Sequence, residues 1–411
     1  MSTQYYKLVS FYIVSFLILY MEPIEIAGGL TFGIIWKLIL MLFLFFPVLY
    51  NILRDKRMEM LAIFSILFAL KLLLSYTSMD AIMKTMTLLT KEMMFPLLFL
   101  YFTIKVKKSE TLIFIVKHFS IVIILSFVPY MLGILEPFAE GYDLAEFGHI
   151  GQYGLIGPFI KPHSGAITLS LSMIMVTTYV KKENSLNENI IYIAFLILGF
   201  YELINTYVRT GIMIYMVSLL YMYLKDIDFK KIVLLIMTAF TIFGVGVYMY
   251  QTNDVFRMRF EDKNKYNGDK GGSGGSGRLI FWKNAVENWL DDDDSVILIG
   301  LGYDYSREKM YHDTGMLIFA HNRFLQVLQQ EGLIGFGLFL TYLILVYQFI
   351  LRYKDSQYYT ATNAIFIGIL IEMMFQGGFF FNIVLYLSAY LVILKKDYEN
   401  NQIVRTVQIV K

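Results

Sequence analysis

Apolar stretches long enough to cross a lipid bilayer recur along most of the chain, and this feature limits what the chain can fold into. A transmembrane helix needs about 20 consecutive, mainly apolar residues. Such stretches occur at roughly 8–21, 30–53, 58–77, 83–104, 111–135, 164–180, 189–204, 207–224, 231–250, 333–351, 358–375 and 379–394. The sequence therefore predicts an all-α polytopic membrane protein with about twelve transmembrane helices.

The composition supports a membrane protein and excludes several kinds of site. Of the 411 residues, 57% are hydrophobic and 17% are charged, whereas about one-quarter of a soluble domain is charged. The chain has no cysteine, which excludes disulfides, thiolate nucleophiles and cysteine-bound metals. Its net charge is only +2, so no general attraction for nucleic acid is expected.

Basic residues between the apolar stretches predict the orientation in the membrane. Alternate connections carry lysine and arginine, and the others have few of either wherever they are short. The basic residues are Arg54, Lys56, Arg57, Lys105, Lys107, Lys108, Lys181, Lys182, Lys225, Lys230, Lys231, Arg352, Lys354, Lys395 and Lys396. By the positive-inside rule, these connections and both termini are predicted to be cytoplasmic.

Two of the predicted outer connections are long. We expect residues 1–250 to hold nine spans and an outer loop at 136–163, residues 251–332 to form a large outer loop, and residues 333–411 to hold three spans and a cytoplasmic tail. The large loop contains the run NGDKGGSGGSGR, which is typical of a flexible linker, either natural or engineered. Only this loop is large enough for a soluble subdomain.

Several charged residues fall inside the predicted spans, where a charge usually faces a protein interior or a wet cavity. Those in the outer halves of their spans are Lys71, Lys91, Glu92, Glu202, Arg209 and Glu372, whereas Lys37, Lys117 and His118 do not fit this outer group. Any one of them could instead extend to the membrane surface. Together they predict a charged cavity that opens outward and suits an anionic ligand, such as a diphosphate that enters from the lipid.

The end of the large loop reads FAHNRFLQVLQQEGLIGFG and predicts a short amphipathic helix on the outer bilayer surface. Asn322 is a good N-cap, and Phe324, Leu325 and Leu328 form an apolar stripe at helical spacing. Gly332 should end this helix directly before the next span.

His321 immediately precedes this helix. The helix dipole there disfavours a protonated imidazole and favours a bound anion. A neutral imidazole near a phosphate is a reasonable general base. The alternative is a histidine that simply lies at the membrane interface, and without reference to any relative this is the simpler interpretation.

An earlier segment of the loop, SGRLIFWKNAVENWL, predicts a second short helix. Arg278 lies in its first turn, where a cation is unfavourable to the helix dipole, so an anionic partner is expected. A guanidinium group can contact phosphate oxygens in bidentate fashion. Trp282 is an interfacial anchor or, alternatively, part of a platform for stacking sugars, and anchoring is the simpler interpretation.

The segment 278–335 resembles the O-antigen ligase and polymerase family of integral-membrane glycosyltransferases, which have the GT-C type of fold. That family's pattern is His, then Asn, Ser or Gln, then nine residues, Gly, two residues and Gly. Here His321 and Asn322 are followed by nine residues, then Gly332 and Gly335. Further similar features are Gly277-Arg278, Trp282, Gly300-Leu301-Gly302, and Arg209 in TYVRTG.

The resemblance implies an inverting, metal-independent glycosyltransferase without a cofactor in the bacterial cytoplasmic (inner) membrane. It would transfer a glycan from undecaprenyl diphosphate to an acceptor hydroxyl on the outer, periplasmic face. His321 would be the base, Arg209 and Arg278 would clamp the diphosphate, and further candidates are Lys91, Arg257, Arg259 and Arg323. The expected partners are an undecaprenyl-diphosphate-linked oligosaccharide, membrane lipid, a chain-length regulator and a flippase, with no nucleic acid.

The acceptor distinguishes the members of this family. A polymerase joins the glycan to another lipid-linked repeat unit of O-antigen or capsule, and a ligase joins it to the lipid A core of lipopolysaccharide. Analogy with the larger branch of the family favours a polymerase. A flippase or secondary transporter is a more distant alternative, because such proteins usually have two related halves, whereas here the dominant loop comes late in the chain.

Overall fold

The computed structural model describes residues 3–27, 30–55, 58–75, 82–141, 153–180, 184–224, 250–252, 278–290, 293–315, 318–377 and 381–410. Four sequence predictions fall wholly or mostly outside these residues: the span at 231–250, the glycine- and serine-rich run, and the candidates Arg257 and Arg259.

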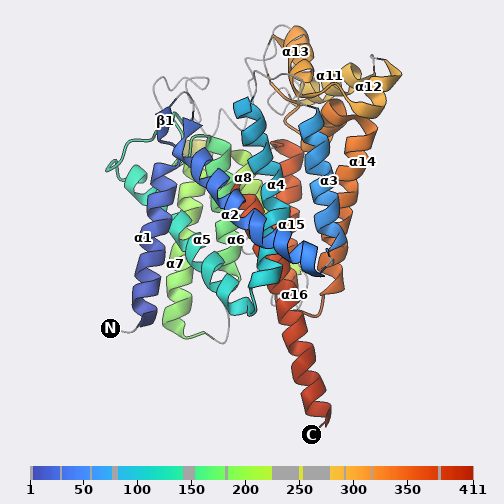
Figure 1. Ribbon diagram of the computed structural model, residues 1–411. Coiled ribbons are helices and arrows are strands. Elements are labelled where there is room, and N and C mark those ends of the chain that lie inside the picture. Colours follow the sequence, from blue (N-terminus) through green and yellow to red (C-terminus); the bar gives the residue numbers. More distant parts are fainter. Residues whose placement is uncertain are drawn as a thin grey trace.

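A bundle of helices makes up most of the described structure (Figure 1). Its helices are α1 (Thr3–Met21), α2 (Phe32–Asp55), α3 (Met60–Leu74), α4 (Ile82–Lys105), α5 (Ser109–Met131), α6 (Pro162–Thr177), α7 (Leu186–Asn205), α8 (Arg209–Leu224), α14 (Arg323–Arg352), α15 (Tyr359–Phe375) and α16 (Phe381–Val410). The predicted spans other than 231–250 each coincide with one of these helices. The count of about twelve spans stays a prediction.

Three shorter helices lie together at one end of the bundle, which we call the loop end (Figure 1). They are α11 (Arg278–Leu290), α12 (Asp294–Ile299) and α13 (Tyr303–Thr314). A small antiparallel pair of strands, β1 (Glu25–Ala27) and β2 (Leu30–Thr31), connects α1 to α2. Helix α1 begins and α16 ends at the opposite end from α11–α13 (Figure 1).

The outer surface of the bundle carries large exposed apolar side chains, whose contact with water would be unfavourable. On α2, Ile39, Phe43, Phe46 and Leu53 are between 62% and 69% exposed, and their spacing places them on one face of the helix. Such a stripe requires lipid around it. Four described helices are also long and apolar enough to cross a membrane: Phe32–Arg54, Ser109–Met131, Leu186–Asn205 and Arg323–Arg352.

Helices from the two halves of the chain pack against each other. Helix α3 packs against α14, α4 against α16, and α8 against α15. Large aromatic side chains fill the interior, and Phe95, Phe99, Tyr386 and Tyr390 are almost completely buried. Because α14 begins two residues after His321, the packing of α3 on α14 holds the motif against the N-terminal half of the chain.

Helix α14 consists of two helical parts that meet at Gly332, whose backbone is non-helical (φ 63°, ψ −167°). The first part, residues 323–331, is the predicted short helix, and the second is the predicted span. The polar side chains of the first part point into the protein, since Gln329, Gln330 and Glu331 are at most 2% exposed. Phe324 and Leu328 remain partly exposed on the other face.

Candidate active site

His321 has a strained backbone. Its φ of +50° lies in the left-handed region, which few residues other than glycine adopt. Such a conformation costs about 1–3 kcal/mol and persists only where surrounding contacts enforce it. The imidazole ring lies 6.1 Å from the ring of Phe281 on α11, measured between centroids. The strain marks this position as a candidate functional residue.

Asn322 holds the histidine at the beginning of the short helix. Its side-chain oxygen accepts hydrogen bonds from the backbone N–H groups of Phe324 (3.0 Å) and Leu325 (3.2 Å). A cap of this kind stabilises a helix by about 1 kcal/mol. The predicted N-cap is confirmed, and it places His321 one residue before the positive end of the helix dipole.

The surroundings of His321 keep its imidazole neutral. Burial lowers the pKa of His321 below its ordinary value, and the positive charge of Arg278 lowers this pKa further. Both effects disfavour the protonated ring, so the side chain is available as a proton acceptor at neutral pH.

Arg278 is the first residue of α11, and its guanidinium group lies 5.8 Å from the centre of the Phe375 ring. Trp282, one turn further along α11, has its ring 6.3 Å from the same phenyl group. Phe375 ends α15, so this contact anchors α11 to the bundle. The structure therefore brings Arg278 and His321 together, as the resemblance predicts.

Arg209 reaches the same neighbourhood from another helix. It begins α8 and is exposed. The next residue, Thr210, accepts a hydrogen bond from the Gln376 side chain at 3.3 Å. Gln376 directly follows Phe375, so the starts of α8 and α11 both contact the end of α15. Arg278 thus contacts this end of α15 directly, and Arg209 precedes a residue that contacts it.

Arg323 and Glu92 form a buried ion pair, with 2.7 Å between the guanidinium nitrogen and the carboxylate oxygen. Their side chains are 6% and 8% exposed. Removal of one partner from a buried pair is strongly destabilising, by about 3–5 kcal/mol. This contact ties α14 to α4 and gives Arg323 a structural role. A role in diphosphate binding stays a prediction for this residue.

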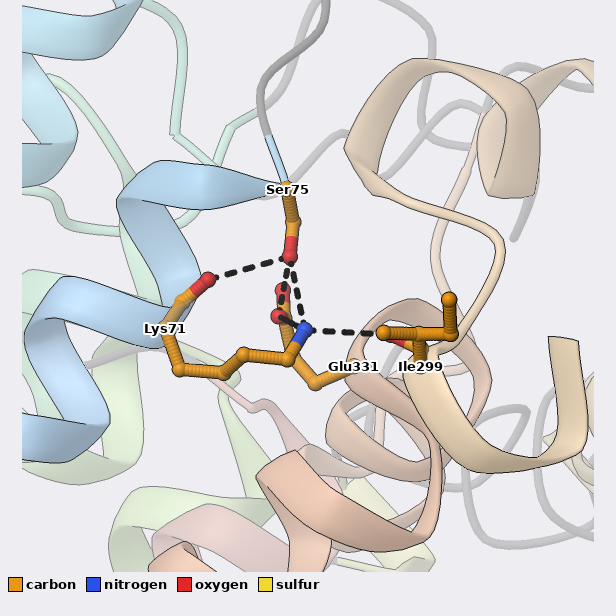
Figure 2. Close-up of polar contacts among 4 residues, drawn as sticks. All are labelled: Lys71, Ser75, Ile299 and Glu331. Atoms are coloured by element: carbon orange, nitrogen blue, oxygen red, sulfur yellow. Dashed lines mark hydrogen bonds and ion pairs between the residues drawn. The ribbon is translucent and has the colours of Figure 1, made fainter. Parts of the chain in front are cut away.

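A second polar network secures the other end of the short helix (Figure 2). The Lys71 ammonium group donates hydrogen bonds to Glu331 (3.0 Å), to Ser75 (3.2 Å) and to the backbone oxygen of Ile299 (3.0 Å). The Ser75 hydroxyl also contacts the Glu331 carboxylate. Gly335 leaves room for the Glu331 side chain, because a Cβ atom at 335 would lie 2.2 Å from Cβ of Glu331. The network joins α3, α12 and α14.

The segment 300–302 binds the end of the short helix through its backbone. The N–H groups of Leu301 and Gly302 donate hydrogen bonds to the carbonyl oxygens of Gln329 and Gln330, each at 2.9 Å. The last carbonyl groups of a helix have no partner within it, so these bonds satisfy them. The Gly-x-Gly sequence is therefore part of the structure that fixes the helix after His321.

Glycine is required where these two backbones meet. Gly300 has φ +89°, and a Cβ atom there would lie 2.2 Å from the Gln330 carbonyl oxygen. A Cβ atom on Gly332 would lie 2.5 Å from the Gly300 nitrogen. The backbones at Gly332 and Gly300 thus lie too close together for a side chain at either position.

The structure changes the interpretation of Lys37 and Lys91. The sequence places Lys37 apart from the outer charged group, and this prediction is wrong. Helix α2 begins at the loop end, so its residue 37 lies near that end and lines the same cavity as Lys91. This cavity is lined by a different set of residues from those around His321.

Among the described residues, no group of three or more His, Asp or Glu side chains could hold a metal ion.

These features define a helical membrane protein whose candidate active site combines a neutral histidine with flanking arginines at one end of the bundle. The model of a family described as O-antigen ligase matches residues 194–340. The match includes Arg209, Arg278, His321, Gly332 and Gly335. Residues 194–340 are therefore similar to the O-antigen ligase family, in agreement with the resemblance seen in the motif. No curated protein matches the chain.

Sequence reasoning missed three features of this site: Glu331, the ion pair between Glu92 and Arg323, and the end of α15. Glu331 carried one usable signal, since a carboxylate directly before the motif glycine needs a cationic partner if it is buried. Nothing in the sequence near Phe375 indicated that it would contact Arg278.

Proposed function

We propose that this protein is a polysaccharide polymerase. It transfers a glycan from undecaprenyl diphosphate to a hydroxyl group of another lipid-linked repeat unit, on the outer face of the bacterial cytoplasmic membrane. The observation that carries the proposal is His321, held neutral and strained beside Arg278 within the matched family domain.

In the proposed reaction, the imidazole of His321 accepts the proton of the acceptor hydroxyl. The hydroxyl oxygen then attacks the anomeric carbon of the donor, and the bond from this carbon to the diphosphate oxygen breaks. The electron pair leaves with the diphosphate, and the attack from the opposite face inverts the anomeric configuration. The imidazolium afterwards releases its proton to water.

Arg209 and Arg278 are proposed to stabilise the leaving diphosphate. Its negative charge increases as the glycosidic bond breaks, and cationic groups already in place stabilise this charge without reorganisation. Two guanidinium groups supply this charge, so the mechanism needs no metal. Arg209 is exposed at the start of α8, where a ligand entering from the lipid can reach it.

The orientation follows from the basic connections. The loop end, with α11–α13, is proposed to face the periplasm, where a flippase delivers the lipid-linked glycan and a chain-length regulator acts on the product. A thiol-labelling scan is direct, because the chain has no native cysteine. A cysteine placed at Lys283, on α11, should react with an impermeant reagent added outside. Labelling of this position only after the membrane is opened would contradict the orientation.

Catalysis is tested with purified protein and a lipid-linked repeat unit. His321→Gln should lower the rate by about 100- to 10,000-fold, because a general base contributes this much. Donor binding and the amount of folded protein should be unchanged. Near-normal activity per folded molecule would remove His321 from the mechanism.

The same assay separates the polymerase from the ligase. A polymerase should produce long glycans from lipid-linked repeat units alone. A ligase should give product only when lipid A core is added. The second outcome would replace the polymerase proposal with the ligase alternative and keep the role of His321.

A further inference from the structure

A second charged cavity lies at the loop end, lined by the beginnings of α2, α6 and α16 and by α4. Its volume is about 290 Å³, far above the roughly 10–15 Å³ that one water molecule needs. Lys37, Lys91 and Lys161 line it from three different parts of the chain. None of these lysines contacts the histidine motif directly in the described structure.

Three lysines and one glutamate line the cavity, so its net charge is positive. Of its three lysines, Lys37 forms an ion pair with Glu22. Among the described residues, the ammonium groups of Lys91 and Lys161 have no hydrogen-bond or ion-pair partner. Lys161 and Lys37 repel the charge of Lys91, and Glu92 attracts it. The neighbouring carboxylate of Glu92 is held by Arg323. Unpaired cations that repel one another are stabilised by a bound anion.

The cavity wall also has an apolar part, beside polar side chains such as Thr90, Ser164 and Asn382. Phe159, Phe381 and Ile34 line it beside the lysines. A free inorganic anion gains nothing from such a wall, whereas a diphosphate attached to a hydrocarbon chain gains from both parts. The combination indicates an amphiphilic anion.

The position of the cavity relates it to the active site. Lys91 is adjacent in sequence to Glu92, whose partner Arg323 follows His321 by two residues. Phe375, at the end of α15, contacts Arg278, and Phe381, at the beginning of α16, lines the cavity. A ligand bound here would contact α4, the helix whose Glu92 pairs with Arg323.

We propose that the cavity formed by Lys37, Lys91 and Lys161 binds the diphosphate of a second polyprenyl-diphosphate lipid, the acceptor of the transfer. This inference rests on the proposed function and deepens it. It assigns Lys91 to the acceptor, while Arg209 and Arg278 hold the donor. Two diphosphate sites are what a reaction between two lipid-linked molecules requires.

Binding of a short analogue tests the proposal. Farnesyl diphosphate is titrated into the purified full-length protein in neutral detergent, and the number of sites is measured by equilibrium dialysis. The wild-type protein should bind two molecules. The double variant Lys91→Gln/Lys161→Gln should lose one site, since each lost lysine weakens binding by about 10- to 100-fold. Arg278→Gln should lose the other site.

Controls separate the sources of binding. Lys283→Gln/Lys309→Gln removes the same charge from α11 and α13 and should still bind two molecules. Inorganic diphosphate should compete weakly, because it cannot use the apolar wall. Equal competition by phosphatidylglycerol would show a general site for anionic lipid and would overturn the proposal.

The kinetic result distinguishes this inference from the proposed function. In Lys91→Gln/Lys161→Gln the KM for the acceptor lipid should rise about 10-fold or more, with the donor KM unchanged. Two remaining sites and an unchanged acceptor KM would refute the acceptor site alone. If the wild-type protein shows no transferase activity, the proposed function is refuted even when Arg278→Gln loses a binding site. Binding in the cavity could still be measured in that case.

Discussion

Replacement of Gly300 by alanine should separate segment 300–302 from the short helix that follows His321. The new Cβ atom would lie 2.2 Å from the Gln330 carbonyl oxygen and 2.4 Å from the Glu331 nitrogen, and neither backbone atom can move away alone. The backbone at φ +89°, ψ 169° adds strain of about 1–3 kcal/mol for a residue other than glycine. Separation of the two segments also breaks two hydrogen bonds, each worth about 0.5–1.5 kcal/mol.

Strain and lost hydrogen bonds together destabilise the contact between segment 300–302 and the short helix by about 2–6 kcal/mol. Amide hydrogen exchange at Leu301 and Gly302 reports it directly, because these two N–H groups donate to the helix. Their exchange should become at least about 25-fold faster, since about 1.4 kcal/mol corresponds to a factor of ten. Transferase activity per folded molecule should fall, because the helix no longer holds His321 beside Arg278.

Two other glycines serve as matched controls. Gly315 has φ +71°, but no atom lies within 4 Å of the position that a Cβ atom would take there, so Gly315→Ala adds strain without a clash. Gly337 has neither feature, and alanine there should be neutral or stabilising by about 0.5–1 kcal/mol. If Gly300→Ala changes exchange at Leu301 and Gly302 no more than Gly315→Ala does, the interlocking of the two backbones is not what holds the helix.

Three further predictions concern charges around the site. Because burial and Arg278 both lower the pKa of His321, the imidazole stays neutral as pH falls through its ordinary value, and activity should persist below that pH. Arg278→Gln should raise this pKa and move the acidic limb of the residual pH–rate profile to higher pH; an unmoved limb would mean that Arg278 does not act on the imidazole. Arg323→Leu should destabilise the protein by about 3–5 kcal/mol in chemical unfolding, and addition of Glu92→Leu should restore much of this loss, whereas additive losses would argue against a buried pair. Arg209→Lys should weaken farnesyl diphosphate binding at the donor site by about tenfold or more, because lysine lacks the bidentate fork; unchanged affinity would remove Arg209 from the clamp.

Local signals predicted the helices and the beginning of the motif. Apolar runs of sufficient length specify membrane helices, because every backbone group must be satisfied within the segment. The short helix could be predicted from two residues, since Asn322 caps its start and Gly332 breaks its end. Both effects depend on neighbours within a few positions, so the sequence alone contains them.

The partners of the charged residues could not be predicted in this way. Lys71 bonds to Ile299 across 228 positions, and Arg323 bonds to Glu92 across 231. The charged group of a lysine or arginine in an apolar segment can extend to the membrane surface, form an ion pair or bind a ligand. Only the packing of distant helices decides among them.

The sequence by itself thus determined that the chain is a helical membrane protein, and its resemblance to a known family predicted His321, Arg209 and Arg278 as site residues. The tertiary structure decided that Arg323 pairs with Glu92 and that Lys37 joins Lys91 and Lys161 in a separate cavity. The physical reason is the range of the interactions. Helix formation and capping act over a few residues, whereas the pairing and grouping of charges depend on which helices pack side by side.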